Sequence, residues 1–113
     1  MDVNEYQKSA SSTATYLHRG DNLVYPVLGL AGESGEVADK VKKILRSKGT
    51  TKPSTLDNET KIELAKEVGD VLWYVALVAE ELGFTLEEVA QMNINKLLSR
   101  KERGVIKGNG DNR

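Results

Sequence analysis

Apolar residues recur every three or four positions through most of this chain, and this spacing constrains the fold more than any other feature. Such a period places the apolar side chains along one face of an α-helix, whereas a half-buried strand needs apolar and polar residues to alternate. The sequence has no long alternating stretch, and no Asn-Gly or Asp-Gly turn joins two β-branched runs. The chain is therefore predicted to be all-α.

Four amphipathic helices are expected, arranged as a four-helix-bundle-like protomer. Gly49 and Gly104 follow the last periodic positions of the second and fourth helices and are the expected helix stops. Thr85 and Glu88 have the spacing of a capping box, which marks the start of the fourth helix. The expected helices cover residues 3–17, 23–48, 58–82 and 85–103, with a loop at 49–58 and a flexible C-terminal tail at 104–113.

The length of the chain bears on its assembly. At 113 residues it has the size of one domain, so residues 1–113 are expected to form a single unit. A helical protomer this short can hide a second apolar face only against another copy of itself. We therefore expect a homodimer or a tetramer.

Composition disfavours several classes of partner and site. Sixteen basic and 17 acidic residues give a formal charge of −1, so no positive field exists to hold polymeric nucleic acid. The absence of cysteine removes disulfides and thiolate zinc sites and is compatible with a reducing cytosol. The most apolar run, residues 71–83, is too short to span a bilayer, and the N-terminus lacks a signal-peptide pattern. A soluble, cytoplasmic protein without a membrane partner is expected.

Two acid pairs are candidates for chemistry: Glu33 with Glu36 on the second expected helix, and Glu67 with Asp70 on the third. In each pair the acids are three positions apart, so both side chains share one helix face. A single pair of this kind is usually a solvated acidic surface. Both pairs here lie in apolar, glycine-containing stretches, and burying unpaired carboxylates is very costly, so acids turned inward need cations.

Glycines lie beside both pairs, at positions 29, 32, 35 and 69, and the loop at 49–58 lets the two helices return antiparallel. A glycine inside a helix costs about 1 kcal/mol relative to alanine. Close approach of the other backbone or of a ligand is the natural explanation for keeping it.

The pairs are then expected to meet as a four-carboxylate cluster. Oxygen ligands without cysteine favour Mg²⁺ as the cofactor, with Mn²⁺ as a substitute.

These motifs resemble those of the MazG-like all-α nucleoside triphosphate pyrophosphohydrolases. The Glu-x-x-Glu pair follows Gly-Leu-Ala-Gly, the Glu-x-x-Asp pair stands on the next helix, and Asn93-Ile-Asn-Lys96-Leu-Leu-Ser-Arg100 lies downstream. The likeness covers roughly Leu23 to Arg103. It implies a helical bundle that dimerises or forms tetramers. It also implies hydrolysis of a nucleoside triphosphate, often a deoxynucleotide, to the monophosphate and pyrophosphate, in house-cleaning or pool control.

The resemblance assigns metal binding and catalysis to four acids. In the metal-assisted mechanism that we expect from them, one acid, Glu36, helps to orient or deprotonate the attacking water. These acids are Glu33, Glu36, Glu67 and Asp70. It assigns the substrate phosphates to Lys96 and Arg100, and Asn93 is included in the predicted phosphate site. Those two residues lie four positions apart and share a helix face with Asn93. Lys96 offers a point charge to polyphosphate oxygens, and Arg100 offers a planar fork of N–H donors.

Other residues receive weaker assignments. Tyr25 and Trp73 are candidates for contact with the substrate base, although packing in the core or an interface is the favoured role of Trp73. His18 lies in a polar turn without an evident partner and is given no catalytic role. The tail either closes over bound triphosphate or is a frayed end.

Two alternative functions stay open. Phosphoribosyl-ATP pyrophosphohydrolase belongs to the same superfamily and uses a comparable acid cluster. A non-enzymatic helical interaction module would carry the acids as a surface patch. Pyrophosphate release from a panel of nucleotides, together with Mg²⁺ binding by a Glu67→Ala variant, separates the three functions.

Overall fold

Four α-helices and one short 3₁₀ turn form the secondary structure of the computed structural model, which describes residues 1–113 and contains no strand. The helices are α1 (Val3–Ser12), α2 (Val24–Lys48), α3 (Asn58–Glu81) and α4 (Leu86–Arg103), and the 3₁₀ turn η1 (Pro53–Thr55) lies in the connection between α2 and α3. The predicted all-α class is confirmed. No helix has both the length and the apolar content that crossing a membrane requires.

Local signals account for most helix ends. Asp57 caps α3 by accepting from the Thr60 backbone N–H, and Thr85 with Glu88 forms the expected capping box of α4. Gly49 and Gly104 follow α2 and α4 with φ of 72° and 71°, a left-handed conformation that glycine adopts without strain. The predicted ranges of α2, α3 and α4 are therefore confirmed to within a residue or two.

The first helix is shorter than its apolar period predicted. It ends at Ser12, because the Thr13 backbone N–H and hydroxyl both donate to the Ala10 carbonyl and close the last turn. Ala14 is buried beyond the helix, in the irregular connection to α2. Apolar residues at helical spacing thus continue past the point where the backbone leaves the helix.

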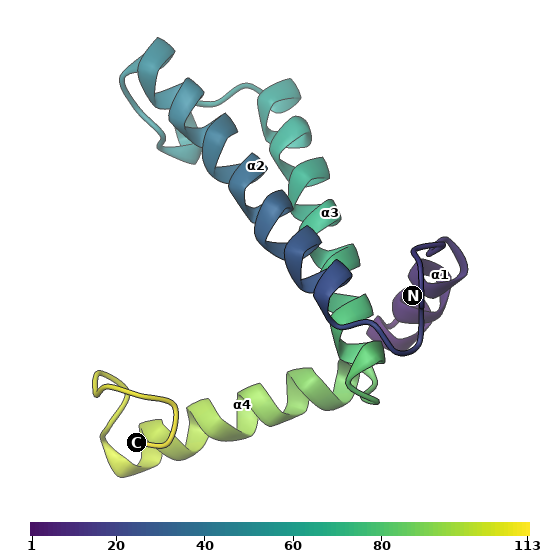
Figure 1. Ribbon diagram of the computed structural model, residues 1–113. Coiled ribbons are helices and arrows are strands. Elements are labelled where there is room, and N and C mark those ends of the chain that lie inside the picture. The colour runs from purple at the N-terminus through teal and green to yellow at the C-terminus, as the bar shows by residue number, and fades with distance from the viewer.

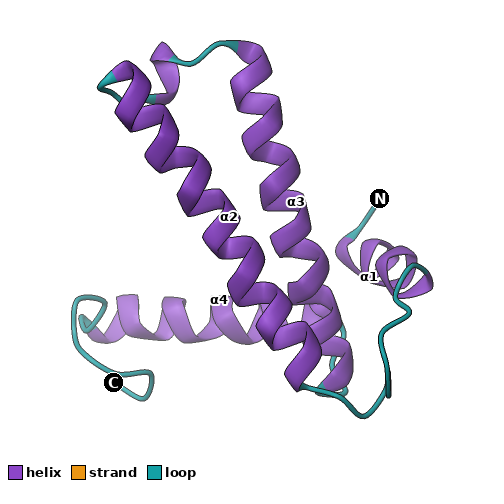
Figure 2. Ribbon diagram, turned by 45° about the horizontal axis from the view of Figure 1, so that its top comes forward, coloured by secondary structure: helices purple, strands orange, loops and turns teal.

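The helices α2 and α3 run antiparallel as a long hairpin, and α1 and α4 both leave from the same end of it (Figure 1). The second view shows the same arrangement, with α4 directed away from the length of the hairpin (Figure 2). The protomer is therefore not a closed four-helix bundle, in contrast to the expectation. Its radius of gyration is 17.0 Å, against about 13 Å for a globular chain of this length.

A buried glutamine fixes the junction from which α1 and α4 leave. The Gln7 side-chain amide donates to the carbonyls of Ala76 and Phe84, both at 3.1 Å, and its oxygen accepts from the Leu86 N–H at 2.9 Å. These bonds satisfy backbone groups where α3 ends and α4 begins. A small apolar core of Ala10, Ala76 and Leu86 surrounds the junction. The direction of α4 is thus set at its first turn.

Close approach of the two hairpin helices is achieved at Gly29, where a β-carbon would stand 2.0 Å from the Tyr74 ring. The other three glycines beside the acids, at positions 32, 35 and 69, meet open space instead. For these three glycines, close approach of the other helix is therefore wrong within the protomer, whereas close approach of a ligand stays a prediction.

Replacing Gly29 with alanine is expected to lower the free energy of unfolding by about 1–3 kcal/mol, because the Tyr74 ring must move from a packed position. Chemical denaturation measures this loss. In a Tyr74→Ala background the same substitution should cost little, since the obstructing ring is gone. An equal loss in both backgrounds would contradict the assignment to the ring contact.

Candidate functional site

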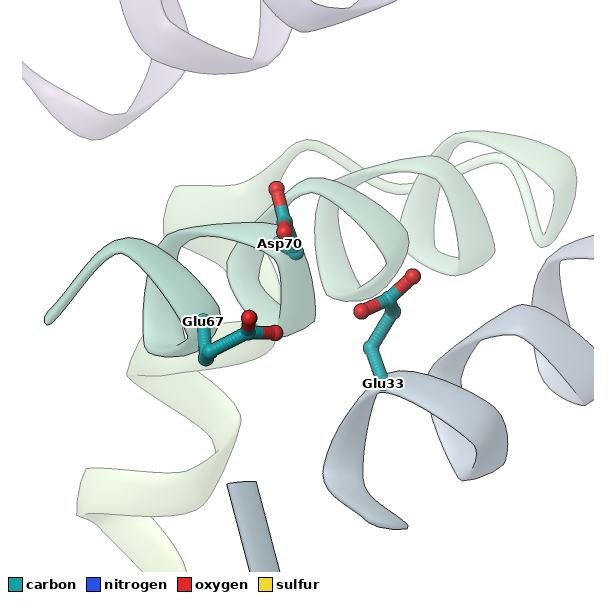
Figure 3. A group of neighbouring side chains, drawn as sticks. All are labelled: Glu33, Glu67 and Asp70. Atoms are coloured by element: carbon teal, nitrogen blue, oxygen red, sulfur yellow. The ribbon is translucent and has the colours of Figure 1, made fainter. Parts of the chain in front are cut away.

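Three of the four predicted acids gather between the two hairpin helices. Glu33 extends from α2, and Glu67 and Asp70 extend from successive turns of α3 (Figure 3). One carboxylate oxygen from each lies within 4.8 Å of the others, a separation that a single bound cation can bridge. The antiparallel return of α3 along α2 thus brings distant acids together, as the sequence predicted.

Glu36 lies outside this close group, one turn further along α2, with an exposed side chain. Its charge still reaches the group. Partial burial raises the pKa of Glu33, and the carboxylates of Asp70, Glu67 and Glu36 raise this pKa further. Repulsion of this kind is relieved when a cation binds, because the cation interacts favourably with every carboxylate.

The raised pKa of Glu33 makes a prediction for the metal-free protein. A carboxyl group whose folded-state pKa exceeds its unfolded value binds more protons when folded, so its contribution to stability falls as the pH rises. In EDTA at pH 7, Glu33→Gln is expected to be more stable than the wild type. The difference should shrink as the pH falls toward about 4.3, the ordinary value for glutamate.

Urea unfolding across this pH range measures the difference directly. Glu102→Gln is the matched control, because Glu102 is exposed on α4 and is remote from the acids in sequence. Saturating Mg²⁺ should reverse the order and leave the wild type more stable than Glu33→Gln. A pH-independent difference in EDTA would refute electrostatic repulsion at Glu33.

One basic residue outside the predicted set contacts the acid group. The Lys40 Nζ lies 3.1 Å from a Glu67 oxygen and 3.9 Å from Glu63. The hydrogen bond to Glu67 raises the pKa of Lys40. A signal was available, because Lys40 follows Glu33 by seven positions and therefore falls on the same face of α2.

The predicted phosphate-binding residues are placed elsewhere in the protomer. Asn93, Lys96 and Arg100 all lie on α4, which leads away from the hairpin that carries the acids (Figure 1). Asn93 is exposed, whereas Lys96 and Arg100 both bind Asp111, at 3.0 and 3.3 Å. Within one chain, the basic pair therefore does not meet the acid group.

The tail after Gly104 folds back on α4. Arg100 is 4% exposed and also donates to the carbonyl of Gly110. Arg113 donates to the carbonyls of Val105 and Ile106 and so closes the turn on itself. The Asp111 carboxylate thus contacts both Lys96 and Arg100, the two residues that were assigned to phosphate.

Aromatic residues adjoin the acid group. The rings of Tyr16 and Tyr25 stack with centroids 4.8 Å apart, and Tyr25 lies 6.4 Å from Tyr74 on α3. Burial raises the pKa of Tyr74, and the charges of Glu33 and Asp70 add to the effect. Tyr25, a predicted base contact, therefore belongs to an aromatic group beside the carboxylates. Tyr16 lies in an irregular segment without a motif, so it could not be identified from the sequence.

Glu81 anchors the segment that carries Tyr16. Its carboxylate accepts from the Tyr16 hydroxyl and from the backbone N–H groups of Gly20 and Asn22, the last two at 2.9 and 3.1 Å. These three donors lower the pKa of Glu81, the Tyr16 hydroxyl most strongly. The connection from α1 to α2 is thereby fixed to the end of α3.

Two residues weighed in the sequence have structural roles. The Trp73 indole N–H donates to the Thr13 hydroxyl at 2.8 Å, and its ring packs against the core at the α1–α3 contact. This arrangement agrees with packing, the favoured role. His18 lies in a turn with φ of 55°, and its carbonyl accepts from the Asp21 N–H.

The donor set fits a hard divalent cation. Glu33, Glu67 and Asp70 offer only carboxylate oxygens, and the chain has no cysteine. Oxygen ligands suit Mg²⁺, Mn²⁺ or Ca²⁺ far better than softer metals. Such an ion can bind phosphate oxygens, so the arrangement is suited to chemistry on a phosphate group.

Comparison with known proteins identifies the family. The chain is 50% identical over 118 residues to the Gene 37 protein of Mycobacterium phage L5, and the alignment covers 100% of both. No solved structure matches the chain. Residues 26–105 match the MazG nucleotide pyrophosphohydrolase domain, a range that contains all four predicted acids and the basic pair on α4. The chain therefore belongs to the MazG nucleotide pyrophosphohydrolase family, whose members hydrolyse phosphoric anhydride bonds of nucleotides.

Proposed function

We propose that the chain is a Mg²⁺-dependent nucleoside triphosphate pyrophosphohydrolase that releases the nucleoside monophosphate and pyrophosphate. Deoxynucleoside triphosphates are the proposed substrate class, and control or cleaning of the nucleotide pool is the proposed role. The observation that carries the proposal is the three-carboxylate group between α2 and α3, within 4.8 Å. Its position inside the matched domain supports the assignment.

Glu33, Glu67 and Asp70 would hold the metal, and Mg²⁺ when bound would supply positive charge that polarises a phosphoryl oxygen and acidifies water. Glu36 is exposed one turn away on the same helix. It is suited to accept a proton from the attacking water, because it lies near the metal-binding acids but is not one of the three that gather closely. In this proposal three carboxylates bind the metal, and the fourth, that of Glu36, accepts the proton.

Tyr25 is the proposed contact for the substrate base. It is about half exposed, and its ring stacks on Tyr16, so the pair forms an aromatic surface beside the acids. Any nucleobase can stack on such a surface, because every base has a π-face. The surface therefore suits an enzyme that recognises its substrates mainly by the triphosphate.

The protein is proposed to act as a homodimer or a larger assembly. Its surface is 8092 Å², whereas a globular chain of 12.4 kDa exposes about 6,100 Å². The excess of about 2,000 Å² is more than the roughly 800 Å² per partner that a standard interface buries. Exposed apolar side chains of α4, at Ile94, Leu97 and Leu98, account for part of this excess surface. Packing of α4 from a second copy against the hairpin would bring Lys96 and Arg100 toward the acids.

Pyrophosphate release from the eight common nucleoside and deoxynucleoside triphosphates, with phosphoribosyl-ATP added, tests the proposed activity. Hydrolysis of deoxynucleotides in Mg²⁺ but not in EDTA is expected. Activity on phosphoribosyl-ATP alone would replace the proposed substrate with that of the histidine-pathway enzyme. Failure to release pyrophosphate from every substrate would overturn the proposal and favour a helical interaction module.

A further inference from the structure

Lys40 is the one basic residue that forms an ion pair with the acid group. Its ammonium lies 3.1 Å from Oε1 of Glu67, a member of the group, and its side chain is 36% exposed. The second contact, to Glu63 at 3.9 Å, is longer and leads away from the acids. The chain therefore places one positive charge where a metal ligand and a bulky anionic substrate would both be found.

The backbone of α2 keeps Lys40 beside the site whatever its ammonium contacts. Glu33, Glu36 and Lys40 stand at positions i, i+3 and i+7, so all three side chains leave the same face of the helix. The lysine side chain has four methylene groups, and its end can move by several ångströms while its α-carbon stays fixed. Loss of the Glu67 contact would leave the ammonium at the rim of the site.

We propose that Lys40 is a phosphate-binding residue of the reaction centre, held on Glu67 until a divalent cation takes that carboxylate. The inference rests on the proposed function and adds a residue to it. A cation at the acid group competes with the ammonium for Glu67 and also repels it. The freed ammonium then offers three N–H donors and a full charge to polyphosphate oxygens, which lysine binds as a point charge.

A purely structural ion pair between α2 and α3 makes different predictions. Exposed pairs of this type contribute little to stability. Loss of the ammonium would then shift cation and anion binding in opposite directions only as weakly as loss of a screened charge such as Lys43 does. The proposed role requires shifts of both affinities that are clearly larger than those in the Lys43 control. Removing the ammonium eliminates a competitor of the metal, and it also eliminates a partner of the phosphate.

Lys40→Met tests the inference, with Lys43→Met as the matched control. Lys43 lies on the same helix and loses the same charge, but it pairs with Asp39 outside the acid group. Calorimetric titration of the full chain with Mg²⁺ alone should show binding about tenfold tighter in Lys40→Met. Titration of the Mg²⁺-loaded protein with inorganic pyrophosphate should show binding about tenfold weaker. Both affinities should change less than about twofold in Lys43→Met.

Lys40→Arg keeps the charge and should retain most of the pyrophosphate affinity. Unchanged or weaker Mg²⁺ binding in a folded Lys40→Met protein would overturn the inference, as would unchanged pyrophosphate binding. Lys40→Gln provides a second variant if Lys40→Met unfolds. Neither titration requires turnover, so opposite shifts in a protein that hydrolyses no nucleotide would support Lys40 and refute only the proposed activity.

Discussion

Glu67→Gln is expected to lower kcat/KM for the preferred nucleotide by about 1,000-fold or more, which corresponds to about 4 kcal/mol of transition-state stabilisation. The Glu67 side chain is 19% exposed and contributes an oxygen to the three-carboxylate group. A glutamine amide has nearly the same shape but carries no charge to bind a cation. Steady-state kinetics over a range of Mg²⁺ concentrations measures the loss, and calorimetry measures the weakened Mg²⁺ binding.

Glu63→Gln is the matched control for this substitution. Glu63 lies one turn earlier on α3, loses the same charge and also contacts Lys40, but its side chain is 52% exposed and does not join the acid group. Its kcat/KM should stay within about threefold of the wild type, because exposed charges are strongly screened. Comparable losses in both variants would indicate a general effect of charge on α3 and would contradict a specific metal role for Glu67.

Local chemistry made most of the helices predictable. The Thr85–Glu88 capping box and the glycines at 49 and 104 act within a few residues, so their effect can be read from the sequence alone. The direction of α4 could not be predicted this way. It depends on the Gln7 side chain binding backbone groups of α3 and α4 that are 69 and 79 positions later, at Ala76 and Leu86. A polar residue on an otherwise amphipathic helix gives no indication of such distant partners.

The acid group was predictable for the same local reason. Spacing of three placed Glu67 and Asp70 on one face, and a hairpin brought Glu33 to them. Lys40 was predictable from its seven-residue spacing to Glu33 but was not identified. The pairing of Lys96 and Arg100 with Asp111 depends on how the tail folds, and glycine-rich tails carry no periodicity from which to infer it.

Leu98→Asp is expected to dissociate the proposed dimer and, with it, to reduce hydrolysis. Leu98 is 59% exposed, and Ile94, one turn earlier on the same face of α4, is also exposed. These side chains stand on the helix that projects from the hairpin, where a second copy can cover them. An unpaired carboxylate buried in such a contact costs about 3 kcal/mol or more. This cost raises the dissociation constant of the dimer by at least about 100-fold.

Sedimentation equilibrium distinguishes the 12.4 kDa protomer from its dimer across a concentration series. Ser99→Asp is the control, because Ser99 leaves α4 about 100° around the helix from Leu98 and about 140° from Ile94, and an aspartate there can still accept the bond from Arg103. It should remain dimeric and active. If Leu98→Asp becomes monomeric yet keeps wild-type kcat/KM, the acid group must receive its phosphate-binding residues from its own chain, and Lys40 rather than the basic pair of α4 is then the residue placed to supply them.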